Sequence, residues 1–210
     1  FAVQVQNGQA RLDAGRISDL RQVINRQGAN GVAPSGIYLQ SLGDSERAGS
    51  AGNLVIQALG SGKNTRLVMN GGSEINADTI NTTGGNIAVA NFETVLLREQ
   101  SSITAEAGAS DRAGNGGNIT LSIPNGFLVA VPEENSNIIA NAFEGAGAQI
   151  RVNALNILGF SAPNTLQSDR LQNDQQSRIS ASSEFGRDGE GTLETLEIDP
   201  SQALIELPSN

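Results

Sequence analysis

Apolar and polar residues alternate in four short segments that recur at nearly equal intervals along the chain. Each segment carries a large aliphatic residue at the same point, and these residues are 33, 32 and 31 positions apart: Leu54, Ile87, Ile119 and Ile150. A period of two over a short run predicts a strand that buries one face. The regular recurrence predicts that the strands belong to one repeating unit.

Each unit is expected to contain two further strands. The second strand is more continuously apolar, as in a crowded parallel stack, and covers 66–70, 94–99, 127–131 and 155–160. The third carries the pattern Ile-x-Ala, in which a small residue after a large one suits a narrow corner, and begins at Ile75, Ile103, Ile138 and Ile179. Residues 36–39 resemble an earlier copy in which Leu39 replaces the alanine. In this phase Ile103 points inward and Thr104 outward.

Three short strands per repeat of about 32 residues predict an all-β fold, a right-handed parallel β-helix with three sides. Each repeat buries its apolar face only against its neighbours, so equivalent strands would pair at about 4.8 Å. The alternative is a β-sandwich or jelly roll, which predicts irregular spacing. We divide the chain into an amino-terminal partial coil or irregular cap (1–35), β-helix coils (36–192), and a terminal partial coil or cap (193–210).

Variation between repeats falls where a stack of coils tolerates it. The loop 43–50 and the larger insertion 161–177, which is rich in Gln, Asn and Asp, are expected to be exposed. Residues 16–27 space their apolar positions as a short helix does, although an irregular coil with strands fits as well. After Gly191 the chain predicts either a last partial coil or a strand edge that Glu and Pro protect from pairing.

Composition removes several function classes. Thirteen basic against twenty-two acidic residues give a net charge of −9, which argues against nucleic acid as a partner. Cysteine and histidine are both absent, so the sequence predicts no disulfides, no His-based triad, no metal site and no cofactor. No apolar run is long enough to span a membrane. The chain begins at Phe1, and we interpret it as part of a longer protein.

Asparagines follow a glycine at equivalent places in three repeats: Asn53, Asn86 and Asn118. Stacked in register, their amides would hydrogen-bond along the stack and satisfy backbone groups at the turns. Gln149 keeps the amide in the fourth repeat. The alternative is a row that binds sugar or metal. The glycines of 114–117 lack the following Lys of a phosphate loop.

Carboxylates provide the only candidate catalytic groups. Glycosidase chemistry needs two carboxyl groups within a cleft, one of them with a raised pKa. The acidic residues that share a repeat are all expected at turns or outward strand positions: Glu93, Glu99, Glu106, Glu133, Glu134 and Glu144. The sequence therefore predicts no catalysis.

Three segments, 116–147, 177–189 and 199–208, resemble in this order the carboxy-terminal repeats and closing motifs of cyanobacterial filamentous-haemagglutinin-type proteins. The resemblance extends over about 37–208. It implies the secreted partner of a two-partner secretion system, exported through an outer-membrane barrel transporter to the cell surface or medium, with a role in adhesion or the extracellular matrix. The transporter would be recognised through a region outside this chain.

Three functions are carried forward. The favoured one is a structural or adhesive rod segment, whose partners would be an extracellular glycan or cell surface and other copies stacked end to end. The second is a carbohydrate-binding module that uses the loops 43–50 and 161–177. The third is a polysaccharide-degrading enzyme that depends on Glu133.

Overall fold

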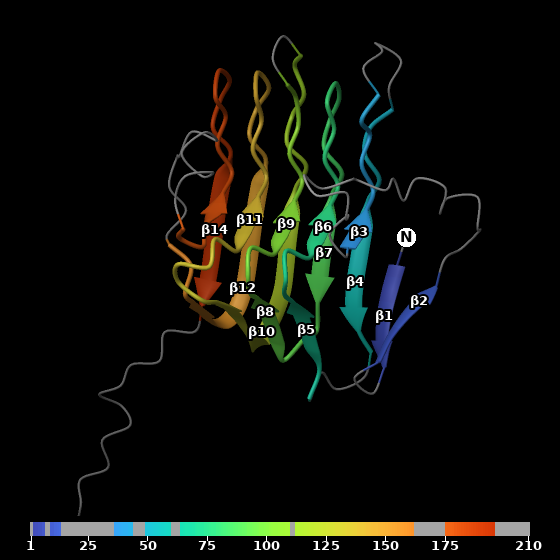
Figure 1. Ribbon diagram of the computed structural model, residues 1–210, viewed down its shortest axis with the longest axis vertical. Coiled ribbons are helices and arrows are strands. Elements are labelled where there is room, and N and C mark those ends of the chain that lie inside the picture. The colour runs from blue at the N-terminus through green and yellow to red at the C-terminus, as the bar shows by residue number, and fades with distance from the viewer. Residues whose placement is uncertain are drawn as a thin grey trace, which may run out of the picture.

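Parallel strands stacked side by side form the protein in a computed structural model (Figure 1). The structure describes residues 2–6, 9–13, 36–43, 49–59, 64–109, 112–161 and 175–195, the first two ranges as backbone only. Fourteen strands and no helix lie in these ranges, so none of them contains a helix that could cross a membrane. The prediction of an all-β fold with parallel sheets is confirmed.

The larger sheet has nine strands, and all of its pairs are parallel except β1–β2. Its main path runs through β14 (Glu190–Thr195), β12 (Gln149–Leu158), β10 (Ile119–Ala130), β7 (Ile87–Ala90), β4 (Leu54–Ala58), β1 (Ala2–Gln6) and β2 (Gln9–Asp13). Off this path, β5 (Arg66–Met69) pairs with β8 (Thr94–Leu97), which pairs with β10. The first and second strands of the repeats therefore belong to one hydrogen-bonded sheet.

The smaller sheet collects the third strand of each repeat. It has five parallel strands in the order β13 (Ile179–Ser180), β11 (Asn137–Ile139), β9 (Ser102–Thr104), β6 (Glu74–Asn76) and β3 (Gly36–Tyr38). Every neighbouring pair in this sheet joins two consecutive repeats, so the chain returns to the same position once per repeat.

Strand register places the aligned aliphatic residues opposite one another. Leu54 pairs with Ile87, Ile87 with Ile119, and Ile119 with Ile150. A second file lies in the smaller sheet and joins Ile37, Ile75, Ile103, Ile138 and Ile179. All of these side chains except Ile37 are buried. Two continuous files of large aliphatic residues therefore fill the core, which the low aromatic content requires.

The separate first and second strands predicted for every repeat occur only in the first two repeats. In the third repeat they merge into β10, which pairs with both β7 and β8, and in the fourth they merge into β12. The register between β10 and β12 shifts between Ile123 and Phe127, where Pro124, Asn125 and Gly126 lie. Gly126 is required there because a Cβ would lie 2.1 Å from the Phe92 carbonyl oxygen. A bulge thus replaces the expected break.

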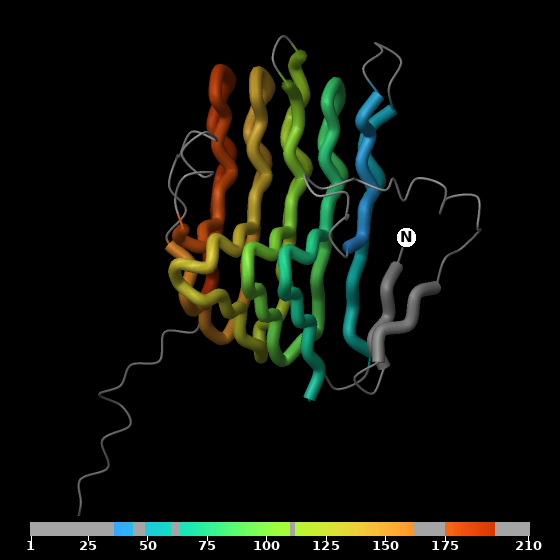
Figure 2. The backbone as a smooth tube through the Cα atoms, viewed as in Figure 1, coloured from blue at the N-terminus to red at the C-terminus, as the bar shows by residue number. Residues whose placement is uncertain are grey.

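Each third strand continues into an extended excursion that we call an arm, formed by 77–86, 105–118, 140–149 and 181–190 in successive repeats. Figure 2 shows the arms side by side at the top of the molecule. The outgoing halves are joined by parallel bridges from Ser41 to Thr79, Ala107, Ala142 and Ser183 in turn. The stack of repeats therefore extends beyond the strands into the arms.

At the base of each arm the outgoing and returning chain touch. The Gly85 N–H donates to the Ala77 carbonyl at 2.8 Å, and the same bond joins Gly117 to Ala105. A Cβ on Gly85 would lie 2.9 Å from the Ala77 Cβ. The alanine of the Ile-x-Ala pattern therefore contacts the glycine that precedes the following first strand, and this close approach requires both residues to be small.

Thr104, which was expected to point outward, is nevertheless buried. Thr104 is only 7% exposed, although it follows the fully buried Ile103. Its hydroxyl lies 3.2 Å from Oδ2 of Asp78, which belongs to the preceding repeat. Both faces of the smaller sheet are covered at this point, because polar side chains at the arm base lie over the outer face.

Three strands lie wholly or partly in the segments predicted as caps: β1 and β2 within 1–35, and β14 at the start of 193–210. β1, within 1–35, pairs with β4 in parallel and with β2 in antiparallel orientation. β14 pairs with β12 in the register of a further first strand, and it runs across the boundary expected between 192 and 193. The segment 16–27, for which a helix and an irregular coil were both considered, lies outside the described residues, as do the centre of the loop 43–50, most of the insertion 161–177 and the chain after 195.

Candidate functional site

The asparagines singled out in the sequence form a hydrogen-bonded ladder. Oδ1 of Asn53 accepts from the Asn86 backbone N–H and from Nδ2 of Asn86, both at 2.9 Å. Oδ1 of Asn86 accepts from the Asn118 N–H at 3.0 Å, and Oδ1 of Asn118 from the Gln149 N–H at 2.9 Å. Each amide therefore satisfies the backbone of the next repeat.

The ladder ends at Gln149. The next N–H in register, that of Glu190, donates to the Ala148 carbonyl, and Oε1 of Gln149 accepts from Arg151 at 3.2 Å. The longer glutamine side chain does not reach back as asparagine does. Because the Oδ1 atoms of the ladder are occupied by backbone donors, the arrangement favours the structural interpretation over a row that binds sugar or metal.

A tight turn follows the second strand in the first two repeats and has the same hydrogen bonds in both. The Ser73 N–H and hydroxyl donate to the Asn70 carbonyl, and Ser101 makes the same two bonds to the carbonyl of Arg98. In the first repeat the central residues are glycines, Gly71 (φ 61°) and Gly72 (φ 73°). Left-handed backbone is unstrained at glycine.

In the second repeat the same turn is strained. Its central residues are Glu99 (φ 53°) and Gln100 (φ 66°), and each has a Cβ that opposes the left-handed conformation. Such a residue costs roughly 1–2 kcal/mol. The surrounding structure must hold this turn in place, since the sequence itself disfavours it.

Glu134, from the following repeat, holds the strained turn. Its carboxylate accepts from Nε of Arg98 at 2.6 Å, from Nη2 of Arg98 at 2.7 Å and from the Glu99 N–H at 3.0 Å. Its backbone carbonyl accepts from the Gln100 N–H at 2.9 Å. The hydrogen bonds from Arg98, and then that from Glu99, hold the pKa of the Glu134 carboxyl below its usual value. In return, the hydrogen bond to Glu134 raises the pKa of Arg98.

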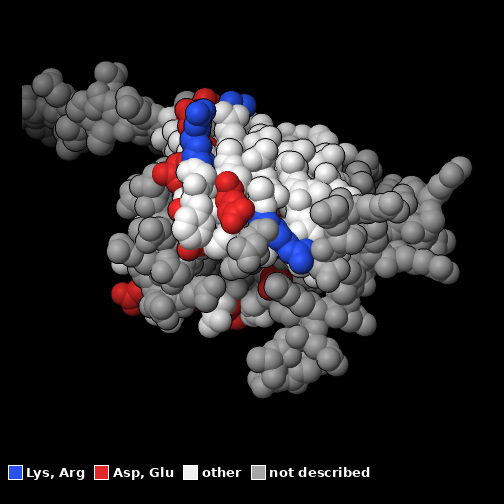
Figure 3. All heavy atoms as spheres, turned by 90° about the horizontal axis from the view of Figure 1, so that it is seen from above, with Lys and Arg blue, Asp and Glu red and all other residues white. Residues whose placement is uncertain are grey.

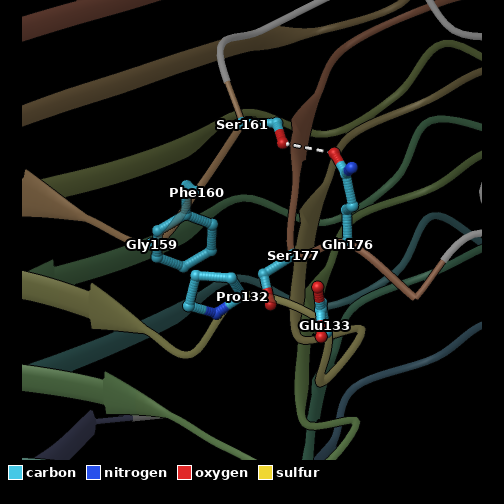
Figure 4. A pocket seen from close by; sticks show the side chains of 7 residues that line it. All are labelled: Pro132, Glu133, Gly159, Phe160, Ser161, Gln176 and Ser177. Carbon is cyan, nitrogen blue, oxygen red and sulfur yellow. Dashed lines mark hydrogen bonds between the residues drawn. The ribbon is translucent and has the colours of Figure 1, made fainter.

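A shallow hollow of about 280 Å³ lies at the same corner, one repeat further on (Figure 4). Side chains from three segments line it: Pro132, Glu133, Gly159, Phe160, Ser161, Gln176 and Ser177. The Ser161 hydroxyl donates to Oε1 of Gln176 at 2.9 Å, and the Ser177 hydroxyl to the Val131 carbonyl at 2.9 Å. An apolar ring, a carboxylate and amide and hydroxyl groups thus border one small opening.

The other carboxylates considered as catalytic candidates are dispersed. Glu133 is exposed on left-handed backbone (φ 67°), and Glu144 is exposed on an arm. Oε2 of Glu93 accepts from the Asn64 N–H at 2.6 Å. Glu134 is engaged by Arg98, and the described ranges contain no group of three acidic side chains able to hold a metal. Of the described carboxylates, Glu133 lines the hollow beside Phe160.

Sequence reasoning missed an apolar file on the outside of the second strands. Register joins Val68 to Leu96, Leu96 to Val129, and Val129 to Leu158. Val68 is 52% exposed and Leu158 46%. The sequence shows only that these runs are continuously apolar, whereas every second side chain points outward. Because the runs are continuously apolar, no alternation in the sequence marks which side chains point outward.

The arms carry aromatic and charged side chains. Phe143 and Phe185 meet edge to face with ring centroids 5.0 Å apart, and Phe185 is 69% exposed. Seen from above, described side chains of both charge signs lie on this end of the molecule (Figure 3). Among the described side chains, the charge on this face is therefore mixed in sign.

Comparison with known proteins gives no relative. No family model, no curated protein and no solved structure matches the chain.

Proposed function

We propose that the chain is a structural or adhesive rod segment of a secreted or cell-surface protein of the filamentous-haemagglutinin type, wound as a right-handed, three-sided parallel β-helix. The observation that carries the proposal is the unbroken register of equivalent residues from Leu54 through Ile87 and Ile119 to Ile150. A right-handed winding follows from the strong preference of parallel crossovers. Repeats that contact only their neighbours make an elongated body suited to spanning distance.

The stacking of successive repeats is tested by disulfide trapping, which is practicable because the chain has no cysteine of its own. Ser122 and Asn153 are register partners on β10 and β12, so Ser122→Cys with Asn153→Cys should oxidise readily. The control pair, Thr120→Cys with Asn153→Cys, is displaced by two residues and should oxidise more slowly. Equal rates for the two pairs would contradict the stacked repeats.

The adhesive role is tested with the purified chain coupled to beads. Beads should be retained on cell surfaces or extracellular polysaccharide, and retention should disappear with the core variant Leu121→Asp, which removes the folded rod. Turnover is tested in parallel by a reducing-sugar assay on uronic and neutral polymers. Sugar release that Glu133→Gln abolishes would replace the adhesive proposal with an enzymatic one.

A carbohydrate-binding module is the second candidate, and the hollow beside Phe160 favours it. The Phe160 ring offers an apolar face, and Glu133 with Gln176 offers hydrogen-bonding groups for sugar hydroxyls. A glycan array should then show binding that Phe160→Ala and Glu133→Gln each remove, with Glu144→Gln on an arm as the matched control. Binding insensitive to both hollow variants would eliminate this candidate.

Export through an outer-membrane barrel transporter is part of the same proposal. It predicts a transporter gene beside the gene for this protein, and accumulation of the full-length protein inside cells that lack the transporter. Normal appearance of the protein in the medium of such cells would contradict the proposed route.

A further inference from the structure

Three Asn-Gly pairs lie in the described part of the chain, at Asn70–Gly71, Asn115–Gly116 and Asn125–Gly126. We propose that Asn70 is a site of spontaneous deamidation and that the fold protects Asn115. In this reaction the Gly71 backbone nitrogen attacks Cγ of Asn70, an N–Cγ bond forms, and ammonia leaves. Water then opens the cyclic imide at either carbonyl, which gives aspartate or isoaspartate.

The turn at Asn70 is open to this reaction. Asn70 and Gly71 are both exposed, and no described residue hydrogen-bonds the Asn70 side chain or the Gly71 N–H. Gly71 has no Cβ to hinder ring closure, and the next described atom near that position, Oε2 of Glu99, is 4.0 Å away. The hydrogen bonds of this turn involve other groups: the Asn70 carbonyl accepts from the Ser73 N–H and hydroxyl, and the Gly72 N–H donates to the Glu99 carbonyl. The attacking and attacked groups are therefore both free to meet.

The pair at Asn115 has the same sequence and the opposite environment. Oδ1 of Asn115 accepts from the Ala146 N–H at 2.8 Å, and the Gly116 N–H donates to the Ala146 carbonyl at 3.0 Å. Gly116 is buried, and a Cβ there would lie 2.5 Å from the Ala140 carbonyl oxygen. Attack requires both hydrogen bonds to break, so Asn115 should react at least about tenfold more slowly than Asn70.

The pair at Asn125 is an intermediate case. The Asn125 side chain is exposed, but Gly126 is buried within β10 against the Phe92 carbonyl. The extended strand holds the Gly126 nitrogen away from the geometry of ring closure. We therefore expect Asn125 to react more slowly than Asn70 in the folded protein.

Deamidation would change the charge of the corner that Glu134 holds. Met69 pairs with Leu97, so Asn70 occupies in the first repeat the position that Arg98 occupies in the second. A carboxylate at residue 70 would lie one repeat from the Arg98 guanidinium, on the side opposite to Glu134. The Gly71–Gly72 turn has the backbone freedom to accept the extra methylene of isoaspartate.

The test compares folded and urea-unfolded protein incubated at mildly alkaline pH, with peptide mapping by mass spectrometry and an isoaspartate assay. Among the three described pairs, conversion in the folded protein should concentrate at Asn70. In urea these three pairs should react at similar rates, because each asparagine is followed by glycine. The two other Asn-Gly pairs of the sequence, Asn7–Gly8 and Asn30–Gly31, are followed separately in the same peptide map. Asn70→Gln should remove the part of the early acidic species that the map assigns to residue 70, and Asn115→Gln should leave that part unchanged. Folded protein in which Asn115 reacts as fast as Asn70, or in which Asn70 resists while it reacts in urea, would overturn the proposal.

Discussion

Glu134 binds Arg98, which lies thirty-six residues earlier in the chain, through both of its carboxylate oxygens. These oxygens accept hydrogen bonds from the Arg98 guanidinium at 2.6 and 2.7 Å. The same carboxylate accepts a hydrogen bond from the Glu99 N–H. One side chain of the third repeat therefore pairs with the Arg98 charge and also holds the backbone of a turn in the second repeat. In the turn it fixes, two consecutive residues other than glycine, Glu99 and Gln100, adopt left-handed backbone. Attraction between repeats thus supports a local conformation that the sequence disfavours.

Glu134→Gln should lower the melting temperature. The amide keeps the shape of the side chain but loses its charge and one of the two acceptors for the Arg98 fork. Thermal unfolding followed by circular dichroism measures the change. Glu144→Gln, on an exposed arm, is the control and should melt as the wild type does.

The Glu134 pair should also make stability depend on pH. Because folding lowers the pKa of Glu134, its contribution is present above the pKa of glutamate in the unfolded chain, about 4.3, and is lost as the pH falls through the lower folded value. The melting temperature of the wild type should therefore fall more steeply below about pH 5 than that of Glu134→Gln. Parallel pH profiles would show that the ion pair has no linked stability.

Glu99→Gly should stabilise the protein. Glycine removes the Cβ that opposes φ of 53°, at the expense of a more flexible unfolded chain, for a net gain of roughly 0.5–1 kcal/mol. Ser122→Gly, at an exposed position in β10, is the matched control and should destabilise. Chemical denaturation measures both, and a loss of stability in Glu99→Gly would mean that its side chain contributes more than the strain it causes.

Leu121 and Ser122 test which face of the first strands is buried. Leu121 is fully buried and Ser122 is exposed on the same strand. An unpaired carboxylate in the core is strongly unfavourable, so Leu121→Asp should lower the free energy of unfolding by more than about 3 kcal/mol. Ser122→Asp should change it by no more than about 0.5 kcal/mol. Ile103 and Thr104 make a poorer pair, because Thr104 is also buried and an aspartate there would face Asp78.

Asn118 and Gln149 test the amide ladder at the point where it ends. Asn118→Ala leaves the Gln149 N–H without its acceptor and should cost about 1 kcal/mol. Gln149→Ala removes no bond to the next repeat, and its effect should stay within about 0.5 kcal/mol. Equal losses of stability in the two variants would show that the hydrogen bond from the Gln149 N–H to Asn118 does not stabilise the protein.

The sequence predicted the repeating features because they depend on periodicity. A spacing near 32 residues and alternation within each strand predict that Ile87 lies opposite Leu54, since a slip of one residue would turn one apolar face outward. The asparagine row follows from the same alignment, since a residue at a fixed offset from a paired strand is itself paired. Short-range pattern was sufficient for these features.

Features that depend on one particular contact were beyond the sequence. The Arg98–Glu134 pair joins residues at unequal offsets in their repeats, and nothing in the local sequence marks Glu99 for left-handed backbone. The covered outer face at Thr104 depends on Asp78 from the preceding arm. The merging of two strands into β10 depends on a bulge at Pro124–Gly126, a segment that lies between two strands predicted to be separate.

The contact between Gly85 and Ala77 links residues of one repeat, whereas the ladder bonds of the strands link each repeat to the next. Because each repeat pairs with the next through equivalent residues, it offers the same two faces to its neighbours and is interchangeable with them. Duplication or deletion of one such unit in the gene would lengthen or shorten the stack by about 4.8 Å while the remaining contacts re-form unchanged. Proteins that descend from this one can therefore differ in length by whole repeats and keep the same core.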